Sequence, residues 1–210
     1  MLQFITHCTE HYSYLDGAIA ALEGGCKWIQ LRMKDAPLDE IKRTAQQLKP
    51  LCHKHEALLI VDDHAEIVTE LDIDGVHLGK NDMPIAEARE LLGEKYIIGG
   101  TANTFENIVT LTQQGADYIG LGPFRFTTTK QNLSPIIGIE GYRRIVAQCL
   151  QAGIDTPLVA IGGIEVTDIE DIMATGVAGI ALSGAILRAD NPTLTTEKII
   201  NNLNQIKHGK

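Results

Sequence analysis

The sequence predicts a (β/α)8 barrel that occupies a single domain, residues 1–210. Short apolar runs alternate with segments of helical spacing from one end of the chain to the other, which indicates a parallel sheet. Polar residues follow many different strands, whereas an open sheet gathers its functional residues near one point. No G-x-G-x-x-G turn follows the first strand. These observations favour a closed barrel whose site lies at the carboxyl ends of the strands.

The strands and helices alternate at fairly even intervals along the chain. The expected strands are Gln3–Thr6, Trp28–Arg32, Leu58–Val61, Gly75–His77, Tyr96–Gly99, Tyr118–Gly120, Leu158–Ile161 and Gly179–Leu182. The expected helices are Tyr14–Glu23, Leu38–His55, Ala65–Leu71, Ile85–Leu92, Phe105–Gln114, Gly141–Gln151, Val166–Ala174 and Thr195–Ile206. Glycines follow several of the helical runs, as is common at helix ends.

Composition limits the classes of partner. The formal net charge of −9 argues against nucleic acid or an anionic membrane surface, because both favour a basic face. No apolar run approaches the ~20 residues that cross a bilayer, and the first residues lack an export signal, so we expect a cytoplasmic protein. The four cysteines lack metal-ligand spacing and are expected to be reduced and mostly buried. The number of subunits is open, and a homo-oligomer is compatible with the sequence.

Three polar residues alternate with apolar ones where the second strand ends. Gln30, Arg32 and Lys34 occupy every second position, and such residues lie on the same side of an extended segment. In a barrel that side faces the mouth, where a guanidinium and an ammonium can bind phosphate or diphosphate. The alternative is a solvated edge with surface charges, against which the apolar strand before them argues.

Acidic residues follow the third and fourth strands. Asp62 and Asp63 follow the third strand, and Asp82 lies in the loop after the fourth. Carboxylates on adjacent strand ends suit Mg²⁺ that also binds substrate phosphate oxygens, so Asp63 and Asp82 are the predicted metal ligands. Turn formation, or capping of the next helix by Asp82, is the competing interpretation. His77, between apolar neighbours, is expected to be a hydrogen-bonded interior residue.

The fifth and sixth strands lead into loops with hydroxyl groups. Gly99, Gly100 and Thr101 allow close backbone approach and supply a hydroxyl, and Thr104 can cap the next helix. The sixth strand is followed by a long loop, 123–138, whose hydroxyls and lysine suggest a lid that holds an anion.

Glycines also follow the last two strands. Gly162 and Gly163 come after the seventh strand, and Ser183 and Gly184 after the eighth. In βα barrels these two loops often bind phosphate through backbone N–H groups and a helix N-terminus. We therefore expect a phosphate site here, the alternative being glycines that only permit tight turns.

Taken in order, these segments resemble the thiamine phosphate synthase family from Gln30 to Ile186. The matching elements are Q-L-R-M-K, D-D-H for the family's usual N-D-R, D-G-V-H-L-G-x-x-D, G-G-T, G-x-G-P-x-x-x-T-x-T-K, A-I-G-G-I and S-G-A-I. The resemblance implies an enzyme that joins a hydroxymethylpyrimidine diphosphate to a hydroxyethylthiazole phosphate. The products would be diphosphate and thiamine phosphate, and the cofactor would be Mg²⁺.

The resemblance also implies roles for individual residues. Gln30 would contact the pyrimidine, and Asp63 and Asp82 would hold Mg²⁺. The diphosphate would be surrounded by Arg32, Lys34, Asp62, Thr101 and Lys130, and the thiazole phosphate by Thr127, Thr129, Gly163, Ser183 and Gly184. The predicted catalytic residues are Arg32, Lys34 and Lys130, which with Mg²⁺ would stabilise negative charge on the departing diphosphate. The thiazole nitrogen attacks as a neutral nucleophile, so no protein base is required.

The chain departs from the family pattern at several positions. Asp62 replaces the usual Asn and adds negative charge beside the diphosphate, so it could instead bind the metal or hold a lysine. His64 stands where Arg is common and Lys80 where Gln is common, which would partly restore positive charge. The start, Phe4–His7, lacks the acidic residue that often follows the first strand, and its role is open.

Two other functions are compatible with the same fold. A thiazole tautomerase shares the barrel and the phosphate site but needs neither diphosphate nor metal. Retention of Arg32, Lys34, Asp63, Asp82 and Lys130 argues against it. A noncatalytic thiamine-precursor-binding protein would bind ligand without turnover.

Overall fold

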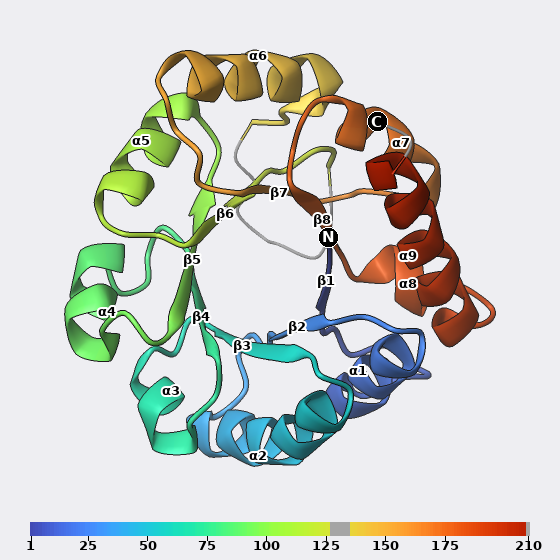
Figure 1. Cartoon of the computed structure of the whole chain (residues 1–210). Coiled ribbons are helices and arrows are strands. Elements are labelled where there is room, and N and C mark those ends of the chain that lie inside the picture. Colours follow the sequence, from blue (N-terminus) through green and yellow to red (C-terminus); the bar gives the residue numbers. More distant parts are fainter. Residues whose placement is uncertain (127–134, 209–210) are drawn as a thin grey trace.

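Eight parallel strands form a closed ring surrounded by helices in the computed structural model, which describes residues 1–126 and 135–208 (Figure 1). The strands follow one another in chain order from β1 to β8, and β8 pairs with β1. The predicted closed (β/α)8 barrel is therefore confirmed. Within the described residues, no helix is both long enough and apolar enough to cross a membrane.

Each predicted strand and helix overlaps an observed one. The strands are β1 (Leu2–Ile5), β2 (Trp28–Leu31), β3 (Leu58–Asp62), β4 (Gly75–Leu78), β5 (Ile97–Ala102), β6 (Tyr118–Leu121), β7 (Leu158–Ile161) and β8 (Gly179–Leu182). The helices are α1 (Tyr14–Glu23), α2 (Leu38–Lys54), α3 (Glu66–Leu71), α4 (Ile85–Leu92), α5 (Phe105–Gln113), α6 (Gly138–Gln151), the 3-10 turn η1 (Val166–Asp168), α7 (Ile169–Ala174), α8 (Gly184–Leu187) and α9 (Pro192–His208). Sequence periodicity missed α8, because four residues make only one turn.

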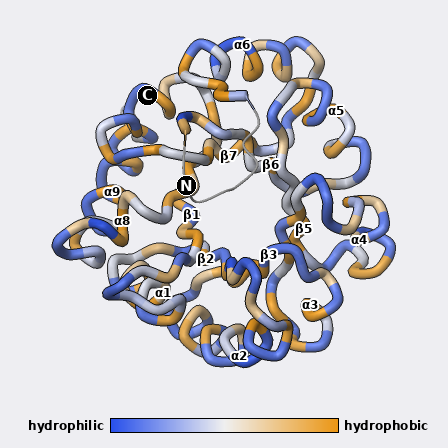
Figure 2. Tube along the Cα trace, turned by 180° about the vertical axis from the view of Figure 1, so that it is seen from behind, coloured by the Kyte–Doolittle hydropathy of each residue, from blue (hydrophilic) through white to orange (hydrophobic). Residues whose placement is uncertain are grey.

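Hydrophobic side chains form two cores, one on each side of the sheet. The larger core lies between the strands and the helices, and Figure 2 shows hydrophobic residues along the strands and on part of most helices. The smaller core fills the barrel with Ile5, Trp28, Ile60, Tyr118, Val159 and Ala181. Because successive strand residues point to opposite sides, strands such as β1 and β2 contribute to both cores. Cys26, Cys52 and Cys149 are buried, as predicted, and Cys8 is exposed.

Two strand glycines make room for the large side chains inside the barrel. A Cβ at Gly99 on β5 would overlap the ring of Tyr118, and a Cβ at Gly120 on β6 would lie 3.1 Å from His77 Cε1. Gly99 and Tyr118 are register partners on adjacent strands. Small residues on β5 and β6 therefore allow Tyr118 and His77 to occupy the interior.

Gly99→Ala is expected to lower the free energy of unfolding by about 2–4 kcal/mol, because Tyr118 must leave its position in a close-packed interior. The control is Gly153→Ala, where a Cβ meets no atom within 4 Å and only the positive φ of +68° opposes it. That variant should lose about 1 kcal/mol. Equal losses in urea unfolding would show that overlap with Tyr118 is not the cause.

Candidate active site

Asp62 joins Gln30 and Arg32 at the carboxyl ends of β2 and β3. Arg32 Nε lies 3.1 Å from Asp62 Oδ2, and Gln30 Nε2 donates to Asp62 Oδ1 at 3.2 Å. The Arg32 and Asp62 side chains are 19% and 10% exposed, so this ion pair is shielded from most of the solvent. Among the described residues, Asp62 therefore contacts an arginine, a partner that was not among the alternatives considered for it.

Thr6, just beyond β1, fixes the backbone of Arg32. Its Oγ1 accepts from Arg32 N at 2.9 Å and donates to Arg32 O at 3.2 Å, and the residue is 1% exposed. This assigns a structural role to the start of the chain, which the sequence left open. A hydroxyl bonded to both backbone groups of Arg32 fixes the backbone from which its side chain extends to Asp62.

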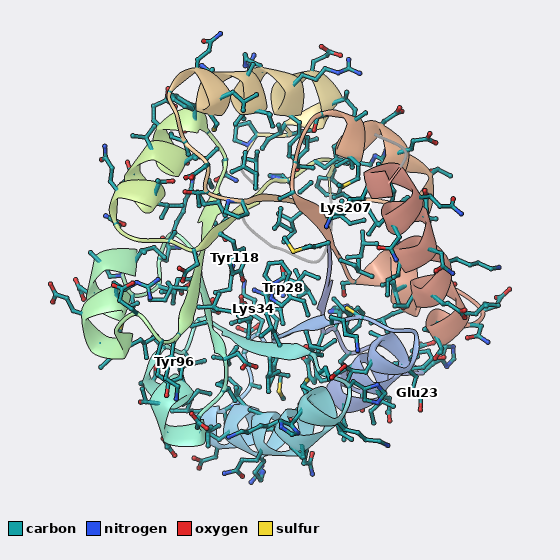
Figure 3. All side chains as sticks on the ribbon, in the orientation of Figure 1. Glu23, Trp28, Lys34, Tyr96, Tyr118 and Lys207 are labelled. Atoms are coloured by element: carbon teal, nitrogen blue, oxygen red, sulfur yellow. The ribbon has the colours of Figure 1, made fainter. Side chains whose placement is uncertain are left out.

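Lys34 lies on the same loop as Arg32, after β2, but strand alternation does not determine its position. Strand β2 ends at Leu31, Ala36 N donates to Met33 O in a turn, and Asp35 has a positive φ of +66°. The side chain of Lys34 is exposed, and Figure 3 shows it inside the ring of strands when the barrel is viewed end-on. The alternation argument thus holds for Gln30 and Arg32 and ends before Lys34.

The two predicted metal ligands, Asp63 and Asp82, lie close enough for their carboxyl groups to interact. Asp82 Oδ2 also accepts from Gly79 N at 2.6 Å and so shapes the loop after β4. The N-cap of α4 is Pro84, so the interpretation of Asp82 as a helix cap is wrong, whereas its role in a turn is confirmed.

The pKa of Asp63 is raised from its ordinary 3.8 to about 6. Loss of hydration is the largest cause, followed by the hydrogen bond with Asp82 and repulsion between the two carboxylates. Although the side chain reaches solvent, protein atoms crowd it at the barrel mouth. Across the described residues, no group of three or more His, Cys, Asp or Glu is arranged to hold a metal ion. Two neighbouring carboxylates nevertheless fit Mg²⁺, which usually takes few protein ligands and completes its shell with water or phosphate oxygens.

Thr101 on β5 lies at the mouth and contacts His77 from β4. Its Oγ1 is 2.9 Å from His77 Nε2, and His77 Nδ1 is 3.0 Å from the hydroxyl of Tyr118. His77 is 6% exposed, so the prediction of a hydrogen-bonded interior histidine is confirmed. Thr104 caps α5 through a bond from Asn107 N at 3.2 Å, as one interpretation held.

The loops after β7 and β8 provide an open backbone and a buried hydroxyl. Gly162 and Gly163 both have positive φ, and a Cβ at Gly163 would lie 2.9 Å from two backbone oxygens. Ser183 precedes the short helix α8, which begins at Gly184. Within the described part of the chain, Ser183 Oγ is buried and has no hydrogen-bond partner, as expected of a group that meets a ligand oxygen.

Arg125 was missed by sequence reasoning and holds the loop after β7. Its guanidinium binds both carboxyl oxygens of Asp168 at 2.8 and 2.9 Å and donates to Gly163 O at 3.1 Å. Its backbone N donates to Gly162 O at 3.0 Å. Nothing in the local sequence marks this role, because the partners lie about forty residues later in the chain. Thr127, Thr129 and Lys130 follow shortly after and lie outside the described residues.

The thiamine monophosphate synthase family model matches residues 2–186. The chain belongs to this family. The predicted resemblance is therefore confirmed, and it extends further toward the N-terminus than the motifs that carried it. Glycine-rich loops, paired carboxylates and the arginine at the ends of separate strands thus belong to a barrel of the thiamine monophosphate synthase family.

Similar proteins carry the corresponding name. The chain is 62% identical to the thiamine-phosphate synthase of Bacteroides thetaiotaomicron and 64% identical to that of Bacteroides fragilis. Each alignment covers 95% of this chain and at least 96% of the relative. Among solved structures, thiamine phosphate pyrophosphorylase from Pyrococcus furiosus shares 34% identity with a TM-score of 0.84, covering 98% of this chain and 96% of that one. A 3-hexulose-6-phosphate synthase, at 16% identity and a TM-score of 0.65, shares the fold alone.

Proposed function

We propose that this chain is a thiamine-phosphate synthase that joins a hydroxymethylpyrimidine diphosphate to a hydroxyethylthiazole phosphate and releases diphosphate. The names and identities of its relatives support this activity. The observation that carries the proposal is the gathering of an ion-paired arginine and two neighbouring carboxylates at adjacent strand ends of one barrel.

The described residues supply the groups that such a reaction needs. The carbon–oxygen bond to the diphosphate breaks, so negative charge develops on the departing oxygen and positive charge on the pyrimidine methylene. Arg32 would stabilise the departing diphosphate, and Thr101 would donate to it from β5. Lys34, from the same loop as Arg32, and Lys130 are proposed to act with it. The thiazole nitrogen then bonds to the methylene, and no proton has to be removed from it.

Gln30 and the later loops would orient the two substrates. Gln30 is 1% exposed and anchored on Asp62, so its amide is fixed beneath the mouth and is proposed to recognise the pyrimidine. The buried hydroxyl of Ser183, with Gly163, Gly184, Thr127 and Thr129, is proposed to receive the thiazole phosphate.

Asp63 and Asp82 are proposed to hold Mg²⁺. When bound, the ion would neutralise diphosphate oxygens and so make the leaving group better. The raised pKa of Asp63 supports this assignment, because loss of hydration and the nearby Asp82 both disfavour its negative charge, and a divalent cation would stabilise that charge. Asp62 is instead proposed to serve the arginine, since both of its oxygens already contact Arg32 and Gln30.

The activity is tested by mixing the purified protein with both precursors and Mg²⁺. We expect thiamine phosphate and diphosphate to appear in equal amounts, which chromatography and a diphosphate assay measure. A thiazole tautomerase would interconvert thiazole carboxylate isomers without releasing diphosphate. A noncatalytic binding protein would bind a precursor and convert neither, and either result would refute the synthase proposal.

A further inference from the structure

We propose that a chain of buried hydrogen bonds inside the barrel orients the hydroxyl of Thr101, with its proton directed into the mouth. On this view Tyr118 and His77 are positioning residues for the diphosphate-bearing substrate. The inference rests on the proposed function, which brings a diphosphate to Thr101.

The chain of bonds crosses the barrel from β1 to β5. Gln3 Nε2 donates to the Tyr118 hydroxyl at 3.3 Å, and this hydroxyl lies 3.0 Å from His77 Nδ1. His77 Nε2 lies 2.9 Å from Thr101 Oγ1. Gln3, Tyr118 and His77 are at most 6% exposed, whereas Thr101 is partly exposed at the mouth. The chain thus begins in the interior and ends at a group that a substrate can reach.

On this proposal, the direction of the chain starts at the amide of Gln3, which donates to the Tyr118 oxygen. Because the Tyr118 oxygen accepts from Gln3, its own proton is available for His77 Nδ1. A His77 whose Nδ1 accepts carries its proton on Nε2 when neutral, and it donates that proton to Thr101 Oγ1. The Thr101 oxygen then accepts from inside the protein, which leaves its own proton to point outward.

Burial keeps the Tyr118 phenol protonated and both rings in place. Loss of hydration raises the pKa of Tyr118 well above its usual range, so the phenol retains a proton to donate to His77. Gly99 and Gly120 leave only enough room for the Tyr118 and His77 rings, and Trp28 packs edge-on against Tyr118 at 4.7 Å between ring centroids. Figure 3 shows Tyr118 and Trp28 inside the ring of strands.

The direction matters because the expected ligand is an anion. A hydroxyl that presents its proton stabilises a diphosphate oxygen, whereas one that presents a lone pair repels it. A donor fixed before the substrate arrives also needs no rearrangement as charge grows on the leaving group. Tyr118 and His77 would therefore act on the substrate through Thr101 without touching it.

The first test reads the histidine directly and needs no activity. Protein labelled with ¹⁵N-histidine is examined by two-bond ¹H–¹⁵N correlation, and His77→Gln assigns the signal. We expect the neutral tautomer with the proton on Nε2 in the wild type, and loss of this single tautomer in Tyr118→Phe. A wild-type His77 that carries its proton on Nδ1 would overturn the proposal.

The second test is a double-mutant cycle on the active enzyme. Tyr118→Phe should lower kcat/KM for the pyrimidine diphosphate about three- to tenfold and leave the KM for the thiazole phosphate unchanged. In a Thr101→Val background the same change should have no further effect, because the hydroxyl that it orients is gone. Additive losses would overturn the proposal, since a merely structural role predicts them.

Tyr142→Phe is the matched control. Tyr142 is also fully buried, and its hydroxyl donates to Leu121 O at 2.6 Å, away from the Gln3–Thr101 chain. The Tyr142→Phe variant should lose about as much thermal stability as Tyr118→Phe, but its kcat/KM should stay within about twofold of wild type. If the wild-type protein makes no thiamine phosphate, the proposed function is refuted. If the wild type is active but the losses in kcat/KM from Tyr118→Phe and Thr101→Val add in the double variant, only this inference is refuted.

Discussion

Asp63→Asn and Asp82→Asn are each expected to lower turnover by about a hundredfold or more while leaving the fold intact. Each change removes one of two neighbouring carboxylates, and a single carboxylate in this loop geometry binds Mg²⁺ weakly. Steady-state rates measured across a series of Mg²⁺ concentrations test the prediction. Wild-type rates in either variant would remove that residue from the metal site.

The stability of Asp63→Asn should change in the opposite direction from its activity. The folded-state pKa of Asp63, about 6, exceeds the ordinary 3.8, so the folded protein binds this proton more tightly than the unfolded chain. Wild-type stability from this group is therefore greatest below about pH 4 and is lost as pH rises through about 6. Metal-free Asp63→Asn should lack this loss and unfold at a higher temperature than wild type near pH 7.5. The exposed Asp190→Asn serves as the control and should change neither property.

Mg²⁺ should reverse the order of the melting temperatures of wild type and Asp63→Asn. Added to wild type near pH 7.5, the ion binds only the folded protein and raises its melting temperature, whereas Asp63→Asn gains little. A wild type indifferent to Mg²⁺, in a melting experiment and in an assay, would contradict the assignment of these two carboxylates.

The barrel and one corner of its site could be predicted because they depend on local pattern. Alternation of strands and helices indicated eight units, and period-two spacing placed Gln30 and Arg32 on one side of β2. Both meet Asp62, which confirms the common direction. The pattern ends before Lys34, in a turn where Ala36 N donates to Met33 O and Asp35 has a positive φ, and no periodicity could have revealed that turn.

The missed contacts join residues that are distant in the sequence. Thr6 supports Arg32 across β1 and β2, and Arg125 supports Gly163 across the loops after β6 and β7. Each of these residues is unremarkable among its neighbours, and its role arises only when the ring closes. Roles that depend on which strands become neighbours, and not on residue spacing along the chain, therefore could not be predicted from the sequence.

Arg32→Met should abolish most activity and also destabilise the fold. Turnover is expected to fall by about a hundredfold or more, because no other guanidinium is fixed at the end of β2 to meet the departing diphosphate. The free energy of unfolding should fall by about 2–4 kcal/mol, since the Asp62 carboxylate, 10% exposed, loses its ion pair with Arg32.

Asp62→Asn separates these two effects. Added to Arg32→Met, it should restore most of the stability, because the shielded carboxylate that had paired with Arg32 is gone, but it should restore no activity. Alone it should leave an active enzyme, since the amide can still accept from Gln30 and the family commonly has Asn at this position.

Arg89→Met is the matched control for the arginine. Arg89 is comparably shielded, with a side chain 14% exposed, and it pairs with Asp117 at 2.6 Å while donating to backbone carbonyls that include Tyr96 O, just before β5. It lies at the amino ends of the strands, so its loss should reduce stability and leave kcat/KM near wild type. If Arg89→Met and Arg32→Met reduced activity in proportion to their loss of stability, Arg32 would be only a structural residue. Activity lost only with Arg32, and not recovered when Asp62→Asn restores the fold, would identify a cation that acts on the substrate.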